Sequence, residues 1–202
     1  MNDGHNGRML MLLSEERMIT VVDEYRDGIR RAFDALPEEI WAEIVDGEII
    51  VSPFPNDLHQ LIARYLVRLL AVGAPDDWEI EPAAGLIIEP GRQEYRPDIY
   101  VAPATAWTGR RPGAEPDQVR LVIEVVSPGK SDRERDRETK FRVYAAAGIP
   151  LYLLVDRYDG KGFTTLYSTP SRNQYLDAHK VPFGEKLTLP EPFDVEIDTA
   201  RF

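Results

Sequence analysis

The chain has 202 residues, of which 43% are hydrophobic and 29% charged, and a formal net charge of −11 at pH 7. This length and composition indicate a folded protein with its own hydrophobic core, and no apolar run is long enough to cross a membrane. Cysteine is absent, which excludes disulfides and thiolate metal sites. With no N-terminal signal pattern, we expect a cytoplasmic protein whose only metal ligands would be oxygen and imidazole groups.

The acidic charge bears on the choice of partner. A protein that binds phosphates normally presents a basic surface, so a net charge of −11 lowers the expectation of nucleic-acid binding. It does not exclude such binding, because only the local field at the binding groove acts on the ligand.

The first half of the chain predicts an N-terminal extension followed by the start of a domain. Residues 1–36 hold an amphipathic helical pattern whose apolar stripe offers a surface for a homodimer, and residues 37–202 read as one domain. A hairpin is expected over residues 44–51, with its turn at Asp46-Gly47. A helix follows, capped by Asn56 or Asp57.

Two later segments predict buried strands that each contain a carboxylate. They are residues 95–101, which include Asp98, and residues 119–126, which include Glu124. A helix should follow from a capping box at residues 131–134 and end at Gly148. Further strands are expected at 151–155, 163–168 and 174–179. This order predicts an α/β (α+β) fold with a central mixed sheet flanked by helices.

The two strand carboxylates are the strongest candidates for chemistry. Burying an ionised Asp or Glu is costly unless a positive charge compensates it, and Mg²⁺ is commonly held by one or two carboxylates together with waters and substrate phosphates. For Asp98 alone, a strand-end carboxylate in a surface ion pair is the simpler interpretation. For Glu124, which has apolar neighbours on both sides, a functional role is the better one.

Three further residues allow two interpretations each. Lys140 lies on the helix after Glu124 and would suit a metal-bound water, but the alternating charges around it are typical of a solvated, salt-bridged helix face. Glu48 and His59 could extend the acidic cluster, or they could be an ordinary turn carboxylate and a helix-flank histidine.

Over residues 37–180 the chain resembles the Uma-type putative restriction endonuclease family of the PD-(D/E)XK nuclease superfamily. The resemblance is carried by His59, Arg96-Pro97-Asp98 and three longer runs, EIVDGEIIVSP at 43–53, VIEVVSP at 122–128 and KFRVYAAAGIPLYLLVD at 140–156. It implies a restriction-endonuclease-like core and a site that hydrolyses phosphodiester bonds with Mg²⁺, for which Mn²⁺ would substitute.

The resemblance also implies roles for individual residues. Asp98 matches the motif aspartate and Glu124 the second metal ligand, whereas Glu48 matches an additional acid and His59 a recurrent histidine. The superfamily usually places its lysine two residues after the second acid, where this chain has Val126. The family supplies the lysine from the following helix instead, and Lys140 is the matching residue.

These expectations amount to a metal-dependent endonuclease that acts on DNA as a homodimer. The backbone carbonyl of Val125 would complete the metal site, and the candidate phosphate contacts are Arg92, Arg96, Lys130 and Arg133. Two alternatives remain open at this stage. One is a non-catalytic nucleic-acid- or protein-interaction module that retains the nuclease fold, and the other is a phosphoesterase for non-DNA substrates.

Overall fold

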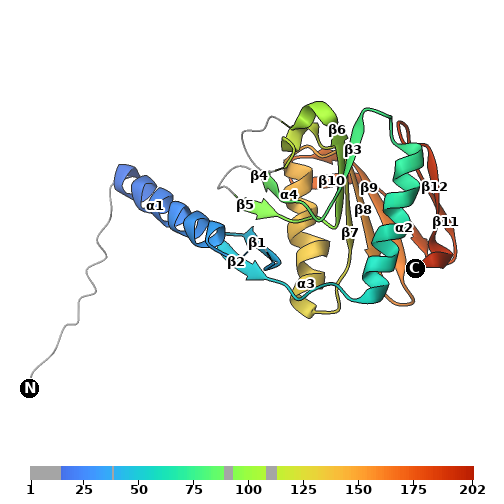
Figure 1. Ribbon diagram of the computed structural model, residues 1–202, viewed down its shortest axis with the longest axis horizontal. Coiled ribbons are helices and arrows are strands. Elements are labelled where there is room, and N and C mark those ends of the chain that lie inside the picture. The colour runs from blue at the N-terminus through green and yellow to red at the C-terminus, as the bar shows by residue number, and fades with distance from the viewer. Residues whose placement is uncertain (1–14, 38, 89–92, 108–112) are drawn as a thin grey trace, which may run out of the picture.

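Two β-sheets and a C-terminal hairpin form the architecture, with helices on both sides of the larger sheet (Figure 1). The computed structural model describes residues 15–37, 39–88, 93–107 and 113–202. Within these ranges, no helix is both long and apolar enough to cross a membrane. The predicted fold class, a central mixed sheet flanked by helices, is confirmed.

The larger sheet has six strands in the order β10-β9-β8-β7-β6-β3. Their bounds are β3 (Trp78–Pro82), β6 (Ile99–Pro103), β7 (Leu121–Val125), β8 (Leu151–Asp156), β9 (Phe163–Ser171) and β10 (Gln174–Pro182). β7 and β8 are parallel, whereas the other neighbours are antiparallel. Parallel strands need a crossover connection, and a helix over residues 130–146 supplies it, so this helix begins a few residues after Glu124.

The smaller sheet has the order β2-β1-β5-β4 and contains the predicted hairpin. Its strands are β1 (Ala42–Val45), β2 (Glu48–Val51), β4 (Leu86–Ile88) and β5 (Gln93–Tyr95). Both turn residues between β1 and β2 have positive φ, 49° at Asp46 and 79° at Gly47, as a tight two-residue hairpin turn requires. The hairpin prediction is therefore confirmed.

The prediction of one continuous strand over residues 95–101 is wrong. The chain ends β5 at Tyr95 and starts β6 at Ile99, and the two strands belong to different sheets. Pro97 explains the break, because proline has no N–H for a strand ladder and restricts the residue before it. Asp98 consequently lies in the step between the two sheets, directly before β6.

Two separate cores lie on the two faces of the larger sheet. Helix α2 (Asp57–Gly73) covers one face together with the hairpin of β11 (Lys186–Leu189) and β12 (Val195–Asp198), which the sequence analysis did not predict. The side chain of Asn56 caps α2 as expected, by accepting a hydrogen bond of 3.0 Å from the His59 backbone N–H. The crossover helix covers the opposite face.

The crossover helix has three consecutive parts: α3 (Lys130–Glu134), a π-helical segment (Arg135–Lys140) and α4 (Phe141–Ala146). The predicted capping box is wrong, because the helix begins two residues earlier than a cap at Ser131 would place it, and its N-cap is Gly129, which makes no side-chain cap bond. The predicted end is confirmed. Gly148 has φ +75°, its N–H donates to the carbonyl of Ala145, and the next N–H reaches Tyr144, which is a Schellman motif.

Helix α1 (Glu15–Asp34) extends away from the two sheets (Figure 1). Its C-terminal end is attached to the smaller sheet through Arg30, whose guanidinium donates to Glu94 at 2.6 Å. Arg30 also pairs with Asp34 one turn later. The helix expected in the N-terminal extension is thus present, while the division of the chain at residues 36 and 37 stays a prediction.

Candidate active site

A polar cavity of about 50 Å³ lies where the smaller sheet, the end of β7, the start of α2 and the crossover helix meet. Its charged lining comprises Glu43, His59, Arg96, Asp98, Glu124, Asp132, Arg135, Asp136 and Lys140. Five of these groups are carboxylates and three are permanent cations, so the lining carries an excess of negative charge. The volume has room for only a few water-sized groups.

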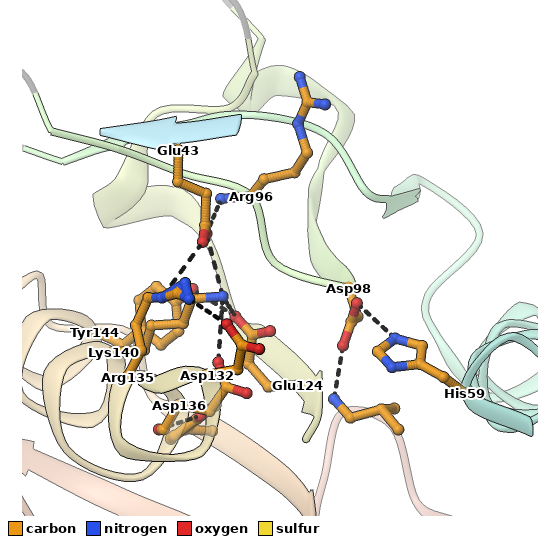
Figure 2. A network of polar contacts seen from close by, with 12 residues as sticks. Glu43, His59, Arg96, Asp98, Glu124, Asp132, Arg135, Asp136, Lys140 and Tyr144 are labelled. Carbon is orange, nitrogen blue, oxygen red and sulfur yellow. Dashed lines mark hydrogen bonds and ion pairs between the residues drawn. The ribbon is translucent and has the colours of Figure 1, made fainter. Parts of the chain in front are cut away.

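Lys140 lies at the centre of the carboxylates (Figure 2). Its Nζ is 2.9 Å from Glu124 Oε1, 3.1 Å from Glu43 Oε1 and 3.5 Å from Asp136 Oδ1. The residue is only 4% exposed. The interpretation of this helix face as solvated is therefore wrong at Lys140, because the helical pair with Asp136 is buried and shared with two other elements.

The protonation of this cluster follows from one ammonium facing three carboxylates. Burial alone would lower the pKa of Lys140, but Glu124, Glu43 and Asp136 together raise that pKa well above its usual value. Lys140 is therefore a permanent cation, and it can donate hydrogen bonds but not accept a proton.

For the carboxyl groups, a raised pKa favours the neutral form, whereas for Lys140 it favours the charged form. One ammonium cannot compensate all of the carboxylates. Burial raises the pKa of Glu124 well above its usual range, and repulsion from Asp136, Asp98 and Glu43 adds to it, although Lys140 opposes the change. Burial likewise raises the pKa of Asp136 to about 7. A second positive charge in this cavity would lower the pKa of both carboxyl groups and favour their ionised forms.

The π-helical segment explains how the crossover helix directs four side chains to one side. Asp132, Asp136, Lys140 and Tyr144 are spaced by four residues. In a regular α-helix each such step gains about 40°, so the outer two would point about 120° apart. A π-helical turn holds more residues and therefore rotates less per residue. The π-helical segment thus reduces the angle between the outer two side chains. The first three therefore line the cavity, and Tyr144 reaches Glu124.

Two further contacts fix the carboxylates of Glu124 and Glu43. The Tyr144 hydroxyl donates to Glu124 Oε1 at 2.8 Å, from the side of the protein core. The Arg96 backbone N–H donates to Glu43 Oε1 at 2.8 Å, and Arg135 Nε lies 3.9 Å from Glu43 Oε2. Each carboxylate is thus held by groups from separate elements, which gives the site a defined geometry before any ligand binds.

Asp98 lies to one side of this cluster and has partners of its own (Figure 2). Its Oδ1 is 2.8 Å from His59 Nε2, and its Oδ2 accepts the Val125 backbone N–H at 2.7 Å. His59 is 4% exposed, and no described group bonds its Nδ1. The bond to Val125 ties Asp98 to the strand that carries Glu124, so the predicted proximity of the two acids is realised although Asp98 is not on a strand.

The other predicted site residues have mixed placements. Glu48 is exposed at the start of β2 and faces a hollow beside α1, so its assignment to the acidic cluster is wrong. Lys130 and Arg133 lie outside the cavity lining: Lys130 is near Glu134, and Arg133 donates to the Pro128 carbonyl. Arg92 lies outside the described residues.

Glu43 occupies the place that was expected for Glu48, and Arg135 is the cation that sequence reasoning missed. In the hairpin register Glu43 pairs with Ile50, whereas Glu48 pairs with Val45 beside the turn. A signal for Glu43 was present, since it is a carboxylate among Ala42, Ile44 and Val45, the same pattern that singled out Glu124. Arg135 had no such signal among the other charges of its helix.

The donor groups suit a hard divalent cation that is bound only in part by protein. Among the described residues, no three His, Asp or Glu side chains are arranged to hold a metal ion together. Mg²⁺ does not need such a cage, because it commonly takes one or two carboxylates and completes its shell with waters and substrate phosphates. The excess of carboxyl groups over cations around Glu124 fits such a cation, which would favour their charged forms.

Comparisons with known proteins identify the family of this chain and relate its fold to that of a solved structure. The family model described as "Putative restriction endonuclease" (Uma2) matches residues 30–200. A crystal structure of a putative nuclease belonging to DUF820 from Anabaena variabilis is similar in fold, with a TM-score of 0.64 and 16% sequence identity. The match covers 86% of this chain and 95% of that one. No curated protein matches the chain.

Proposed function

Since this chain belongs to the Uma2 family of putative restriction endonucleases, we propose that it is a Mg²⁺-dependent endonuclease that hydrolyses phosphodiester bonds in DNA. The observation that supports this most strongly is the buried cluster in which Lys140 is shared by Glu43, Glu124 and Asp136. A structural ion pair needs one carboxylate per lysine. Three acids sharing one ammonium beside the Asp98–His59 pair favour a site that binds a cation and a phosphate.

In this proposal Asp98, Glu124 and the backbone carbonyl of Val125 hold the metal, and Glu43 replaces Glu48 as the supporting acid. Mg²⁺, or Mn²⁺ in its place, would supply Lewis-acid stabilisation of the charge that develops on the scissile phosphate. His59 keeps Asp98 oriented through the 2.8 Å contact with its Oδ1.

Lys140 would orient the attacking water and stabilise the negative charge on the phosphate as a hydrogen-bond donor. Its raised pKa excludes the role of general base, because the ammonium keeps its proton near neutral pH. Arg96 and Arg135 line the cavity, unlike Lys130 and Arg133, and are the stronger candidates for phosphate contacts. Lys130, Arg133 and Arg92 would act further along the substrate.

Cleavage of supercoiled plasmid with Mg²⁺ or Mn²⁺ tests the function. Glu124→Gln keeps the shape of the side chain and removes its charge, and Lys140→Met keeps most of the side-chain volume and removes the ammonium. We expect each variant to cleave at least about 100-fold more slowly than the wild type, because each loses a charge that acts on the reacting phosphate.

The exposed hairpin β11–β12 offers a matched control, because Lys186 pairs with Glu196 there. Glu196→Gln and Lys186→Met make the same chemical changes outside the cavity and should cleave like the wild type. Equal cleavage by all four variants would assign the activity to a contaminant and contradict the proposal.

Calorimetry with Mn²⁺ separates the enzyme from an interaction module that keeps only the fold. We expect one or more binding events in the wild type and weaker binding in Glu124→Gln. A folded wild type that binds no metal would favour the interaction module.

A homodimer is the assembly we propose, through the exposed apolar side chains of α1 such as Val22 and Tyr25. Double-strand cleavage is served by two sites related by a two-fold axis. Sedimentation velocity of the wild type and of Tyr25→Glu tests this, and a wild-type monomer at micromolar concentration would contradict it.

A further inference from the structure

An exposed aromatic side chain lies between two prolines that line the cavity. Phe54, in the connection between β2 and α2, is 74% exposed. Its neighbours on both sides, Pro53 and Pro55, line the cavity together with Trp41 and Arg96. Single exposed apolar residues are common on protein surfaces, so exposure by itself says little. The position beside the candidate active site is what requires an explanation.

The connection is held in place, so the exposure of Phe54 is built into the fold. The Ser52 N–H donates to the Trp41 carbonyl at 2.8 Å, which continues the β1–β2 pairing by one step. At the other end, the side chain of Gln60 donates to the Pro55 carbonyl at 2.9 Å. Both prolines restrict their own φ angles. A ligand that covers Phe54 would therefore pay little conformational entropy for ordering the connection.

Two further planar groups, the Trp41 ring beside Phe54 and the Arg96 guanidinium beside Trp41, enlarge the surface on which a ligand could stack. The rings of Trp41 and Phe54 meet edge to face, with centroids 6.2 Å apart and an interplanar angle of 81°. The Arg96 guanidinium lies 5.2 Å from the centre of the Trp41 ring. Figure 2 shows the Arg96 side chain directed away from the carboxylate cluster. Aromatic rings with an adjacent arginine are the groups on which unpaired bases stack.

The charge of the protein favours such stacking as a source of affinity. The chain has a net charge of −11, and in the cavity Lys140 and Arg135 are already paired with carboxylates. The net charge therefore supplies no general attraction for the phosphate backbone. Base stacking needs no net positive charge, because every base has a π face.

We propose that Phe54, supported by Trp41 and Arg96, is a stacking platform for an unpaired base next to the scissile phosphate, so that the preferred substrates are single-stranded nucleic acids or duplexes with unpaired nucleotides. This rests on the proposed nuclease function. A base in an intact duplex has both faces covered by its neighbours and offers none to Phe54. The cavity of about 50 Å³ cannot take up a base, so the base stays outside on the platform while its phosphate reaches the site.

Fluorescence anisotropy with three labelled probes of equal length tests the platform: oligo(dT), an abasic strand and a blunt duplex. The full-length wild type is measured in EDTA, so that no cleavage occurs. We expect oligo(dT) to bind at least about 10-fold more tightly than the abasic strand, which keeps the phosphates and lacks the bases. Phe54→Ala should weaken oligo(dT) binding by about 5-fold to 150-fold, the effect of losing one aromatic–base stack, and should leave abasic binding unchanged.

Two variants control for the aromatic character and for the location. Phe54→Trp keeps a stacking ring and should retain the affinity. Val51→Ala shortens another exposed apolar side chain, 59% exposed and outside the cavity lining, and should bind like the wild type. Equal affinity for oligo(dT) and the abasic strand would overturn the proposal. So would equal losses in Phe54→Ala and Val51→Ala, or a change of oligomeric state in Phe54→Ala at unchanged affinity.

Cleavage with Mg²⁺ separates this inference from the function on which it rests. The wild type should cut a gapped duplex faster than an intact one, and Phe54→Ala should lose that preference while still cutting. Cleavage with no such preference would overturn the platform alone. If no substrate were cut by the wild type, the endonuclease function would fail, and the binding comparison of the three probes would still decide on the platform.

Discussion

The two faces of the larger sheet carry different kinds of side chain, although the same strands contribute to both. On β7, Leu121, Ile123 and Val125 belong to the core under α2, whose buried side chains are all aliphatic except Phe193. The alternate residues of β7 face the crossover helix, where the core contains Tyr95, Tyr100, Tyr144, Tyr152 and Tyr175. The second face is the one that carries Glu124.

This difference shows how a buried charge can be accommodated inside a core. An aliphatic core offers no donors, so an ionised acid on that side would keep its full desolvation cost. The tyrosine face supplies hydroxyls at defined positions: Tyr144 donates to the carboxylate of Glu124, and Tyr152 donates to the backbone carbonyl of Asp136 at 2.8 Å, which fixes the helix that carries this acid. The polar cluster and its core are therefore one unit, whereas the aliphatic face contributes stability alone.

The largest expected effect on stability is that of Lys140→Met, which removes the cation from the polar cluster on the tyrosine face. Without the ammonium, three buried carboxylates lose their shared cation, and we expect the free energy of unfolding to fall by about 3–5 kcal/mol. Urea denaturation in EDTA measures it. Adding Glu124→Gln to this variant should restore part of the loss. A change below about 1 kcal/mol would contradict the central place given to Lys140.

Leu66→Ala sharpens the comparison from the aliphatic face. Leu66 of α2 is 1% exposed, and its truncation leaves a cavity that costs about 2–5 kcal/mol in a core of this kind. At a temperature where the variant is folded, its Mn²⁺ affinity and cleavage rate should equal those of the wild type. A weaker metal affinity in the folded variant would show that the two faces are coupled.

Tyr144→Phe removes one hydroxyl and keeps the ring, which packs edge to face on Tyr95 and Tyr152. Glu124 then loses its donor on the core side, and we expect a loss of about 1–3 kcal/mol in unfolding free energy. Unlike Leu66→Ala, this variant should also change Mn²⁺ affinity, measured by calorimetry. Unchanged stability and metal binding together would mean that Lys140 alone holds Glu124.

The smallest effect is expected for Lys186→Met on the exposed hairpin β11–β12. Lys186 pairs with Glu196 in solvent, and such pairs contribute little because water screens them and two flexible side chains must be ordered. The urea midpoint should stay within experimental error of the wild type. A loss comparable to that of Lys140→Met would mean that burial does not distinguish the two lysines.

Much of the fold was predictable from the sequence because local signals agreed with the final structure. The hairpin turn at Asp46-Gly47, the cap at Asn56 and the helix end at Gly148 each depend on a few adjacent residues. The assignment of residues 95–101 to one strand failed because apolar periodicity does not report which sheet a segment joins. The hairpin β11–β12 has short strands and was missed for lack of a strong pattern.

The site was predictable where one residue stood out against its own segment. Glu124 did so, and its position at the cavity follows from β7. Asp136 and Lys140 looked like an ordinary helical pair, because the sequence does not show that this side of the helix is buried. The choice of Glu48 over Glu43 failed because it followed a family motif and not the alternation of the hairpin.

The π-helical segment has a consequence for how sequences of this family should be aligned. It holds one residue more than an α-helix needs between Asp136 and Lys140. A relative with two residues between these two positions, where this chain has three, would form a regular α-helix in which the same four side chains still face the cavity, since spacings of four, three and four residues return to within about 20°. An alignment gap in this helix therefore belongs within residues 137–139, where Glu138 is exposed, and relatives of either length can carry the same site.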